Sequence, residues 1–144
     1  MNTFEFTVNG VRYSVNDDNT TVTVVGYPSG SKPTGDLTIP ESITFRGISF
    51  SVTKIGDQAF RSCTGLTSVT IPNSVTSIGD GAFRDCSGLT RIDAYPNPEK
   101  VRTWEDAFCG VPKDGTLHVL PKYLSVYRTA SLWCDFTNIK DDLT

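Results

Sequence analysis

A 23-residue internal repeat constrains the fold of this chain more than any other feature of its sequence. Residues 52–71 read VTKIGDQAFRSCTGLTSVTI, and residues 75–94 read VTSIGDGAFRDCSGLTRIDA. The two segments agree mainly at apolar and glycine positions, whereas differences such as Ser68 against Arg91 fall between those positions. This pattern is typical of a solenoid, because one side of each coil packs against its neighbours while the other side is free to vary.

Incomplete copies flank the two clear ones. Upstream, residues 37–40 (LTIP) match residues 69–72 (VTIP) and provide a leading copy. Downstream, a distorted copy carries an insertion around residues 95–98. In that copy we expect Trp104 to occupy the core position that Ile78 holds in the preceding one.

Each coil is predicted to contain one short strand and one brief helical turn. In the segment LTSVTI, the side chains of Leu66, Val69 and Ile71 are expected to point inward. Ser68 and Thr70 lie between them and point to solvent, and strands of successive coils lie in parallel about 4.8 Å apart. The Ala-Phe pair of each copy begins the helical turn and places its phenylalanine in the core.

The ends of such a stack expose apolar surface, so both ends need caps. Residues 4–8 and 11–15 alternate around an Asn-Gly pair, which is a two-residue hairpin signal, and residues 21–25 predict a third strand. A second small hairpin is predicted around Arg46-Gly47. At the other end, a helix is predicted from about residue 122 to residue 132, after a proline that suits a helix start.

The repeat motif resembles a known family. LxxVxIPxSVxxIGxxAFxxCxxL, which spans residues 66–89, is similar to the BspA-like subclass of leucine-rich-repeat proteins, and residues 107–140 resemble the closing segment common in that family. The fold expected from this resemblance is a short right-handed, β-rich α/β solenoid with an N-terminal β cap and a C-terminal helical cap. Most proteins of that subclass are bacterial and are secreted or held at the cell surface.

We therefore expect one leucine-rich-repeat domain over residues 1–144. Its predicted parts are an N-terminal β cap (1–35), repeat coils (36–120) and a C-terminal cap (121–144). A length of 144 residues suits one domain, and a net charge of -3 without any basic run argues against nucleic-acid binding. No apolar stretch approaches the roughly 20 residues that span a bilayer.

The cysteines predict neither a disulfide nor a metal site. Cys63 and Cys86 fall at equivalent positions of adjacent coils, where their Cβ atoms would lie about 5 Å apart, farther than the ~3.5–4.5 Å that a disulfide prefers. We expect both to be buried reduced thiols. Cys109 continues the spacing of 23, but alignment on the Ala-Phe pair gives this position to Val111 and leaves Cys109 at the surface.

Catalytic and cofactor sites are not expected. His118 is the only histidine, and it can be read either as an outward-facing residue of the last strand or as the base of a nucleophilic pair with Cys109, flanked by Asp106 and Asp114. The first reading is preferred. The repeated aspartates, of which Asp57 is one, are interpreted as turn hydrogen-bonders, and no metal or other cofactor is predicted.

A recognition surface is predicted on the outward side of the strands. If the strands stack in register, polar side chains form one continuous stripe, with an aromatic residue on the inserted loop beside it. The candidate ligand-binding residues are Thr38, Ser68, Thr70, Arg91, Asp93, Tyr95 and His118.

The predicted function is a non-catalytic binding or adhesion module that recognises a host or bacterial surface protein, or a glycan, and acts as a monomer. The alternative is a structural spacer or a module of a larger bacterial surface protein. The chain begins MNTFEF without a basic start and an apolar core. We expect an extracellular or cell-surface protein whose signal segment is absent from this sequence, and a cytoplasmic location is the open alternative.

Overall fold

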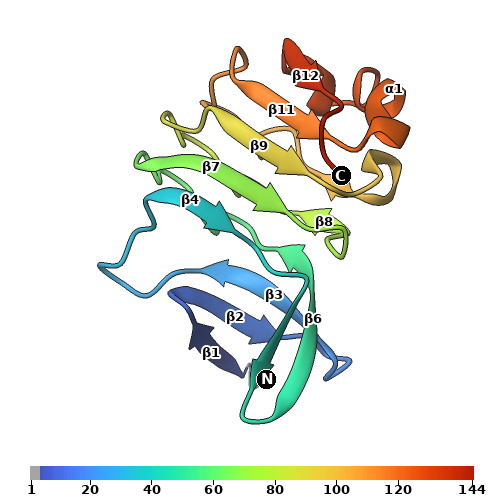
Figure 1. The fold of residues 1–144 in the computed structure, drawn as a ribbon. Coiled ribbons are helices and arrows are strands. Elements are labelled where there is room, and N and C mark those ends of the chain that lie inside the picture. The colour runs from blue at the N-terminus through green and yellow to red at the C-terminus, as the bar shows by residue number, and fades with distance from the viewer. Residues whose placement is uncertain (1–3) are drawn as a thin grey trace.

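Two β-sheets enclose one continuous apolar core (Figure 1). The computed structural model describes residues 4–144. One sheet has five parallel strands, in the order β12 (Asn138–Lys140), β11 (Thr116–Val119), β9 (Arg91–Ala94), β7 (Leu66–Ile71) and β4 (Gly35–Thr38). This sheet faces the viewer in Figure 1.

The second sheet has seven strands and mixes both directions of pairing. Its main path runs through β1 (Glu5–Val8), β2 (Val11–Val15), β3 (Thr21–Gly26), β6 (Ile48–Ile55), β8 (Ser77–Ile78) and β10 (Arg102–Thr103). The remaining strand, β5 (Ser42–Phe45), pairs with β6. Each repeat thus gives one strand to each sheet.

The pairing register follows the repeat. Ser68 pairs with Arg91 and Val69 with Ile92 between β7 and β9, and Lys54 pairs with Ser77 between β6 and β8. Each of these pairs is separated by 23 residues in the sequence. The predicted parallel stacking of the two clear copies is therefore confirmed, and a period fixed by the sequence becomes a period in space.

A column of phenylalanines runs through the core. The ring of Phe83 lies 5.6 Å from that of Phe60 and 5.7 Å from that of Phe108, and the planes are nearly parallel at 17° and 5°. The turns that carry these rings are bonded to one another, because the backbone N–H of Phe83 donates to the Ala107 carbonyl and that of Phe60 to the Ala82 carbonyl. The Ala-Phe positions of the repeat are buried, as predicted.

Glycine after the isoleucine of each clear copy allows the coils to approach closely. A Cβ atom at Gly79 would lie 2.5 Å from Asp57 Oδ1 and 2.6 Å from the Asp57 backbone nitrogen in the preceding coil. The amide of Ala82 bonds back to the Gly79 carbonyl to form the turn. A side chain at this position would push two adjacent coils apart.

The prediction for Trp104 is wrong. Thr103, and not Trp104, pairs with Ile78, and the Ala107 amide bonds to the Trp104 carbonyl as the Ala82 amide bonds to that of Gly79. Trp104 therefore stands at the glycine position of the turn and is 37% exposed. The insertion ahead of this coil shifts the register by one residue, which the spacing alone did not reveal.

Both predicted hairpins are confirmed. The turn between β1 and β2 has positive φ angles at Asn9 (50°) and Gly10 (79°), and the turn between β5 and β6 has them at Arg46 (52°) and Gly47 (79°). These angles suit the tight turns that match the twist of antiparallel strands. The third strand, β3, pairs with β2 on one side and with β6 on the other, and so connects the first hairpin to the repeat coils.

The long C-terminal helix is wrong in extent. A 3-10 turn at Pro121–Tyr123 leads into α1 (Leu124–Tyr127), and a further 3-10 turn at Trp133–Asp135 precedes β12. Tyr127 and Trp133 are both buried, yet six residues of a straight helix would turn them about 240° apart. The chain must bend between them, which ends the helix early.

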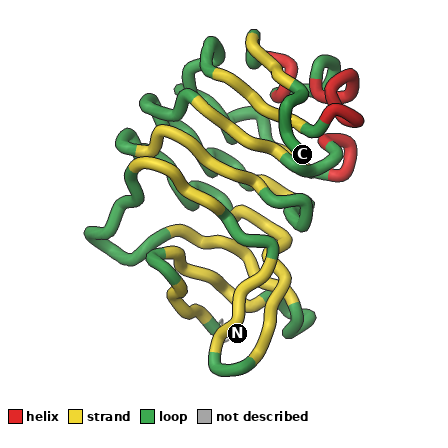
Figure 2. The backbone as a smooth tube through the Cα atoms, viewed as in Figure 1, coloured by secondary structure: helices red, strands yellow, loops and turns green. Residues whose placement is uncertain are grey.

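Most helical structure gathers at the C-terminal end of the stack (Figure 2), and one short 3-10 turn, Pro98–Lys100, lies on the inserted loop. Strand β12 was not predicted. No helix within residues 4–144 has both the length and the apolar character needed to cross a membrane.

Candidate recognition face of the five-stranded sheet

Outward side chains of the five parallel strands form two rows across the sheet. The buried residue between them on each inner strand, such as Val69 or Ile92, anchors the strand and turns its neighbours outward. The first row contains Asp36, Ser68, Arg91, Thr116 and Asn138. The second row contains Thr38, Thr70, Asp93, His118 and Lys140.

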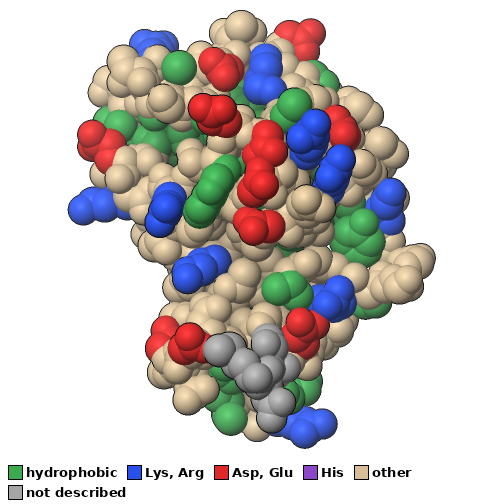
Figure 3. All heavy atoms as spheres, turned by 180° about the vertical axis from the view of Figure 1, so that it is seen from behind, with side chains coloured by type: hydrophobic (Ala, Val, Ile, Leu, Met, Phe, Trp, Pro, Cys, Tyr) green, Lys and Arg blue, Asp and Glu red, His purple; other side chains and the backbone are tan. Residues whose placement is uncertain are grey.

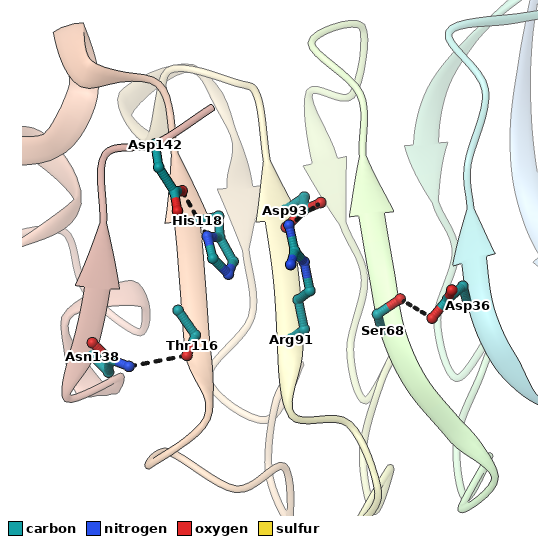
Figure 4. A network of polar contacts seen from close by, with 8 residues as sticks. All are labelled: Asp36, Ser68, Arg91, Asp93, Thr116, His118, Asn138 and Asp142. Atoms are coloured by element: carbon teal, nitrogen blue, oxygen red, sulfur yellow. Dashed lines mark hydrogen bonds and ion pairs between the residues drawn. The ribbon is translucent and has the colours of Figure 1, made fainter. Parts of the chain in front are cut away.

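Hydrogen bonds between neighbouring strands hold the outer parts of the first row (Figure 4). The Ser68 hydroxyl donates to Asp36 Oδ1 over 2.6 Å, from β7 to β4. The Asn138 amide donates to the Thr116 hydroxyl over 2.9 Å, from β12 to β11. These bonds restrict the rotamers of side chains that would otherwise move freely in solvent.

A charged pair occupies the middle of the face. Arg91 Nε lies 3.0 Å from Asp93 Oδ1, two residues along β9, and both side chains project from the sheet in Figure 4. The Asp93 carboxylate raises the pKa of Arg91 above its usual value through this bond. The arginine side chain is 52% exposed and that of Asp93 19%, so the guanidinium is the more accessible partner.

His118 does not lie at the exposed end of the stripe, as predicted. It points out from the sheet, but it is 8% exposed, and its Nδ1 lies 2.6 Å from Asp142 Oδ1 (Figure 4). This contact lowers the pKa of the Asp142 carboxyl. Strand β12 extends the sheet beyond β11, and the residues after it run back along the sheet, where the Leu143 amide bonds to the Val119 carbonyl.

Tyr95 follows β9 and borders a shallow hollow at the carboxyl ends of β4 and β7. Its amide bonds to the Ile71 carbonyl, which fixes the start of the inserted loop against the sheet. The hollow has a volume of about 240 Å³ and mixes apolar and hydroxyl groups. Its lining residues are Thr38, Ile39, Pro40, Glu41, Thr70, Pro72 and Tyr95.

Six of the seven predicted residues therefore lie on or beside one accessible surface, and His118 is covered. Sequence reasoning missed Asp36, Thr116 and the residues of the C-terminal segment. Thr116 could have been found, because it precedes Leu117 as Arg91 precedes Ile92. Nothing periodic in the sequence marks Asn138 or Asp142.

The cysteine predictions are confirmed. Cys63 and Cys86 are buried and free, whereas Cys109 is exposed and Val111 takes the buried position of the third coil. Burial raises the pKa of Cys86 to about 11, and its thiol donates to the Phe60 carbonyl over 3.1 Å. These two thiols fill the core between coils.

The aspartates of the turns form hydrogen bonds between coils, as predicted for Asp57. Asp57 Oδ1 accepts from the Asp80 amide over 2.9 Å, and Asp106 Oδ1 accepts from the Gly81 amide over 3.1 Å. The Asp106 side chain also raises the pKa of Asp80, mainly by a hydrogen bond between the two carboxyl groups. Within residues 4–144 no group of three or more His, Cys, Asp or Glu side chains is arranged to hold a metal ion.

The family comparison matches more than half of the chain. The model described as BspA type leucine rich repeat region (6 copies) matches residues 37–113, which include both clear copies. A comparison with curated protein sequences finds no match.

Solved structures with the same fold come from bacteria. A leucine-rich repeat protein of Bacteroides capillosus is 25% identical with a TM-score of 0.55 over 80% of this chain and 71% of the other. A leucine rich cell surface protein of Faecalibacterium prausnitzii is 27% identical, with a TM-score of 0.54 over 84% of this chain and 28% of its own. A leucine-rich repeat protein of Bacteroides ovatus, at 22% identity, shares the fold with a TM-score of 0.63 over 95% of this chain and 41% of its own.

Proposed function

We propose that this chain, which belongs to the BspA-type leucine-rich repeat family, is a non-catalytic binding module that acts outside a bacterial cell. Its partner is a protein or a glycan, and the contact surface is the open part of the five-stranded sheet, over β4, β7 and β9. The observation that carries this proposal is the pair of polar rows in register, because they form a flat surface on a rigid backbone.

The chemistry of the face suits recognition more than catalysis. Arg91 supplies an exposed guanidinium whose position Asp93 fixes, and arginine held in this way is common where binding energy is concentrated. Thr38 and Thr70 add hydroxyl groups that can both donate and accept. The hollow beside Tyr95 supplies apolar contact at the edge of these polar groups.

Several further points belong to this proposal. The protein acts as a single domain and as a monomer, with the N-terminal strands and the C-terminal segment covering the ends of a right-handed stack. A cell-surface location is supported by the relative described as a cell surface protein. Since the chain spans less than half the length of two of the relatives described above, this domain can also serve as one module of a longer protein.

The test uses purified protein on a glycan array and on immobilised host extracellular-matrix proteins. A ligand identified there is then titrated against the double variant Arg91→Ala with Asp93→Ala. We expect the free energy of unfolding to change by less than about 0.5 kcal/mol, as is usual at a surface, while affinity falls at least about fivefold.

The matched control removes another charged pair, Arg12 and Glu5, which lie 2.6 Å apart on the N-terminal hairpin. Arg12→Ala with Glu5→Ala keeps the net charge in the same way and should leave affinity unchanged. Equal affinity of all three proteins for the ligand would move the site off this sheet. A folded protein that binds nothing in either screen would favour the spacer function.

A further inference from the structure

A second hollow lies beside Trp104, away from the recognition face. It has a volume of about 220 Å³ and shares no lining residue with the hollow at Tyr95 or with the two polar rows. This is smaller than the roughly 300–1,000 Å³ of a typical small-molecule pocket, and it suits one side chain of a partner. Its lining residues are Thr103, Trp104, Glu105, Ser131, Leu132 and Asp135.

The tryptophan that lines this hollow departs from the repeat. The two clear copies have Gly56 and Gly79 at the corresponding turn position, where a side chain would meet the adjacent coil. Trp104 instead turns outward, and it is one of three large apolar side chains exposed among the described residues. An indole at this position contributes little to the core, so its exposure calls for another explanation.

The charge of the hollow is negative and uncompensated. Glu105 and Asp135 form no ion pair within residues 4–144. Lys113 senses the charge of Asp135, but its ammonium group is held by the carbonyl oxygens of Phe108 and Val111, 2.7 and 2.9 Å away. Acidic side chains also gather in a column on this back face of the molecule (Figure 3).

Trp104 already binds a cation. The guanidinium carbon of Arg102 lies 5.0 Å from the centre of the indole ring, which is a cation–π distance. A guanidinium stacked in this way covers one face of a planar ring. The rest of the ring is left to line the hollow.

The far wall of the hollow has an unusual backbone. Leu132 has a φ angle of 75° and a ψ angle of -52°, in a region that residues other than glycine rarely adopt. This conformation reverses the chain between Tyr127 and Trp133 and places Ser131 and Leu132 opposite Trp104. Packing of the buried Trp133 therefore fixes the shape of the hollow.

We propose that this hollow binds a lysine or arginine side chain of a partner protein. The two carboxylates would accept charge-assisted hydrogen bonds from that side chain, and the indole would add a cation–π contact. A neutral sugar is the competing occupant, since it could stack on the indole and bond to the hydroxyl groups. The unpaired negative charge favours the cation.

The test uses an uncharged-background peptide that contains two lysines, and a matched peptide with glutamines in their place. The chain has two tryptophans, and Trp133 is buried, so the two indole N–H signals in a ¹⁵N NMR spectrum report separately. The lysine peptide should shift the Trp104 signal in a saturable manner, while the glutamine peptide should not. Added salt should weaken the binding, because the interaction is electrostatic.

Variants then locate the contact by fluorescence anisotropy of the labelled lysine peptide. Glu105→Gln with Asp135→Asn should weaken binding about fivefold, and Trp104→Leu about two- to fivefold. Glu99→Gln removes an exposed carboxylate elsewhere and should have no effect, and Arg91→Ala with Asp93→Ala should also bind normally.

Three results would overturn this proposal: equal shifts with both peptides, no shift of the Trp104 signal at millimolar peptide, or a response to a neutral oligosaccharide alone. None of them would bear on the five-stranded sheet, because the two sites share no residue.

Discussion

Single residues in this protein are constrained mainly by the copy of the same residue one coil away. The three stacked phenylalanines share one environment, each fully buried and each within 6 Å of the next ring. Aromatic pairs in this arrangement contribute beyond the area that they bury. Phe83 has a ring on both sides and is therefore the most sensitive position of the column.

Replacement of Phe83 with alanine is expected to lower the free energy of unfolding by about 3–5 kcal/mol, because a cavity opens between two packed coils. Urea denaturation followed by circular dichroism measures the change. Phe4→Ala is the control, since Phe4 is 51% exposed, and it should cost less than about 1 kcal/mol. Similar midpoints for both variants would show that the register of the coil is wrong.

The four cysteines should separate into two classes of reactivity. Burial raises the pKa of Cys63 and Cys86, so few thiolates form there and reagents cannot reach them. Cys109 and Cys134 are exposed and should be modified rapidly by a disulfide reagent at about pH 8. The buried pair should react only in denaturant, and detection of a Cys63–Cys86 disulfide by mass spectrometry would contradict the prediction.

At the scale of elements, strands are joined through the side chains between them as well as through their backbones. The C-terminal segment shows this, because β12 pairs with β11 and its following residues bring Asp142 to His118. The pKa of Asp142 is lowered by that bond. A carboxyl whose folded pKa is lowered stabilises the fold above its unfolded pKa of about 3.9, and the contribution is lost as the pH falls through the folded value.

The variant Asp142→Asn should therefore be less stable than the natural sequence at about pH 6, and the difference should shrink as the pH falls to about 3. Denaturant titrations across this range measure the difference. Asp141→Asn changes a neighbouring exposed carboxyl for which no hydrogen bond or ion pair is found in the described part of the chain, and it serves as the control. A deficit that is constant with pH would show that the bond to His118 does not depend on the charge of Asp142.

At the scale of the whole molecule, the C-terminal segment covers the last coil. Trp133 and Phe136 lie against the ring of Phe108, at 5.2 and 5.7 Å, and the Tyr127 hydroxyl donates to the Pro96 carbonyl over 2.6 Å. Without this segment, an apolar surface the width of one coil would face solvent. Repeat proteins need such ends to be covered.

Removal of residues 121–144 should therefore cause association, which light scattering and gel filtration would detect. A milder variant, Trp133→Ala, keeps the whole chain and should lower the free energy of unfolding by about 3–5 kcal/mol through cavity formation. If the shortened chain is folded and monodisperse, the covering role assigned to this segment is wrong.

The sequence by itself determined the repeating part of this protein. Coils that stack closely must present the same residue types to each other, so the buried phenylalanines, the turn glycine and the thiols recur at one period and can be found by inspection. Hairpin turns with Asn-Gly and Arg-Gly were also predictable, because their backbone angles depend on local residues. Most of the recognition face followed from the same period.

Only the tertiary structure decided how the stack ends. The position of Trp104 depends on how an insertion is absorbed, and the burial of His118 depends on a strand that pairs with it from 22 residues further along the chain. Neither contact is periodic, and each is fixed by packing against a surface that exists only once the coils have formed. The ends of the stack therefore differ from the repeat that the sequence displays, because each end has a neighbour on one side only.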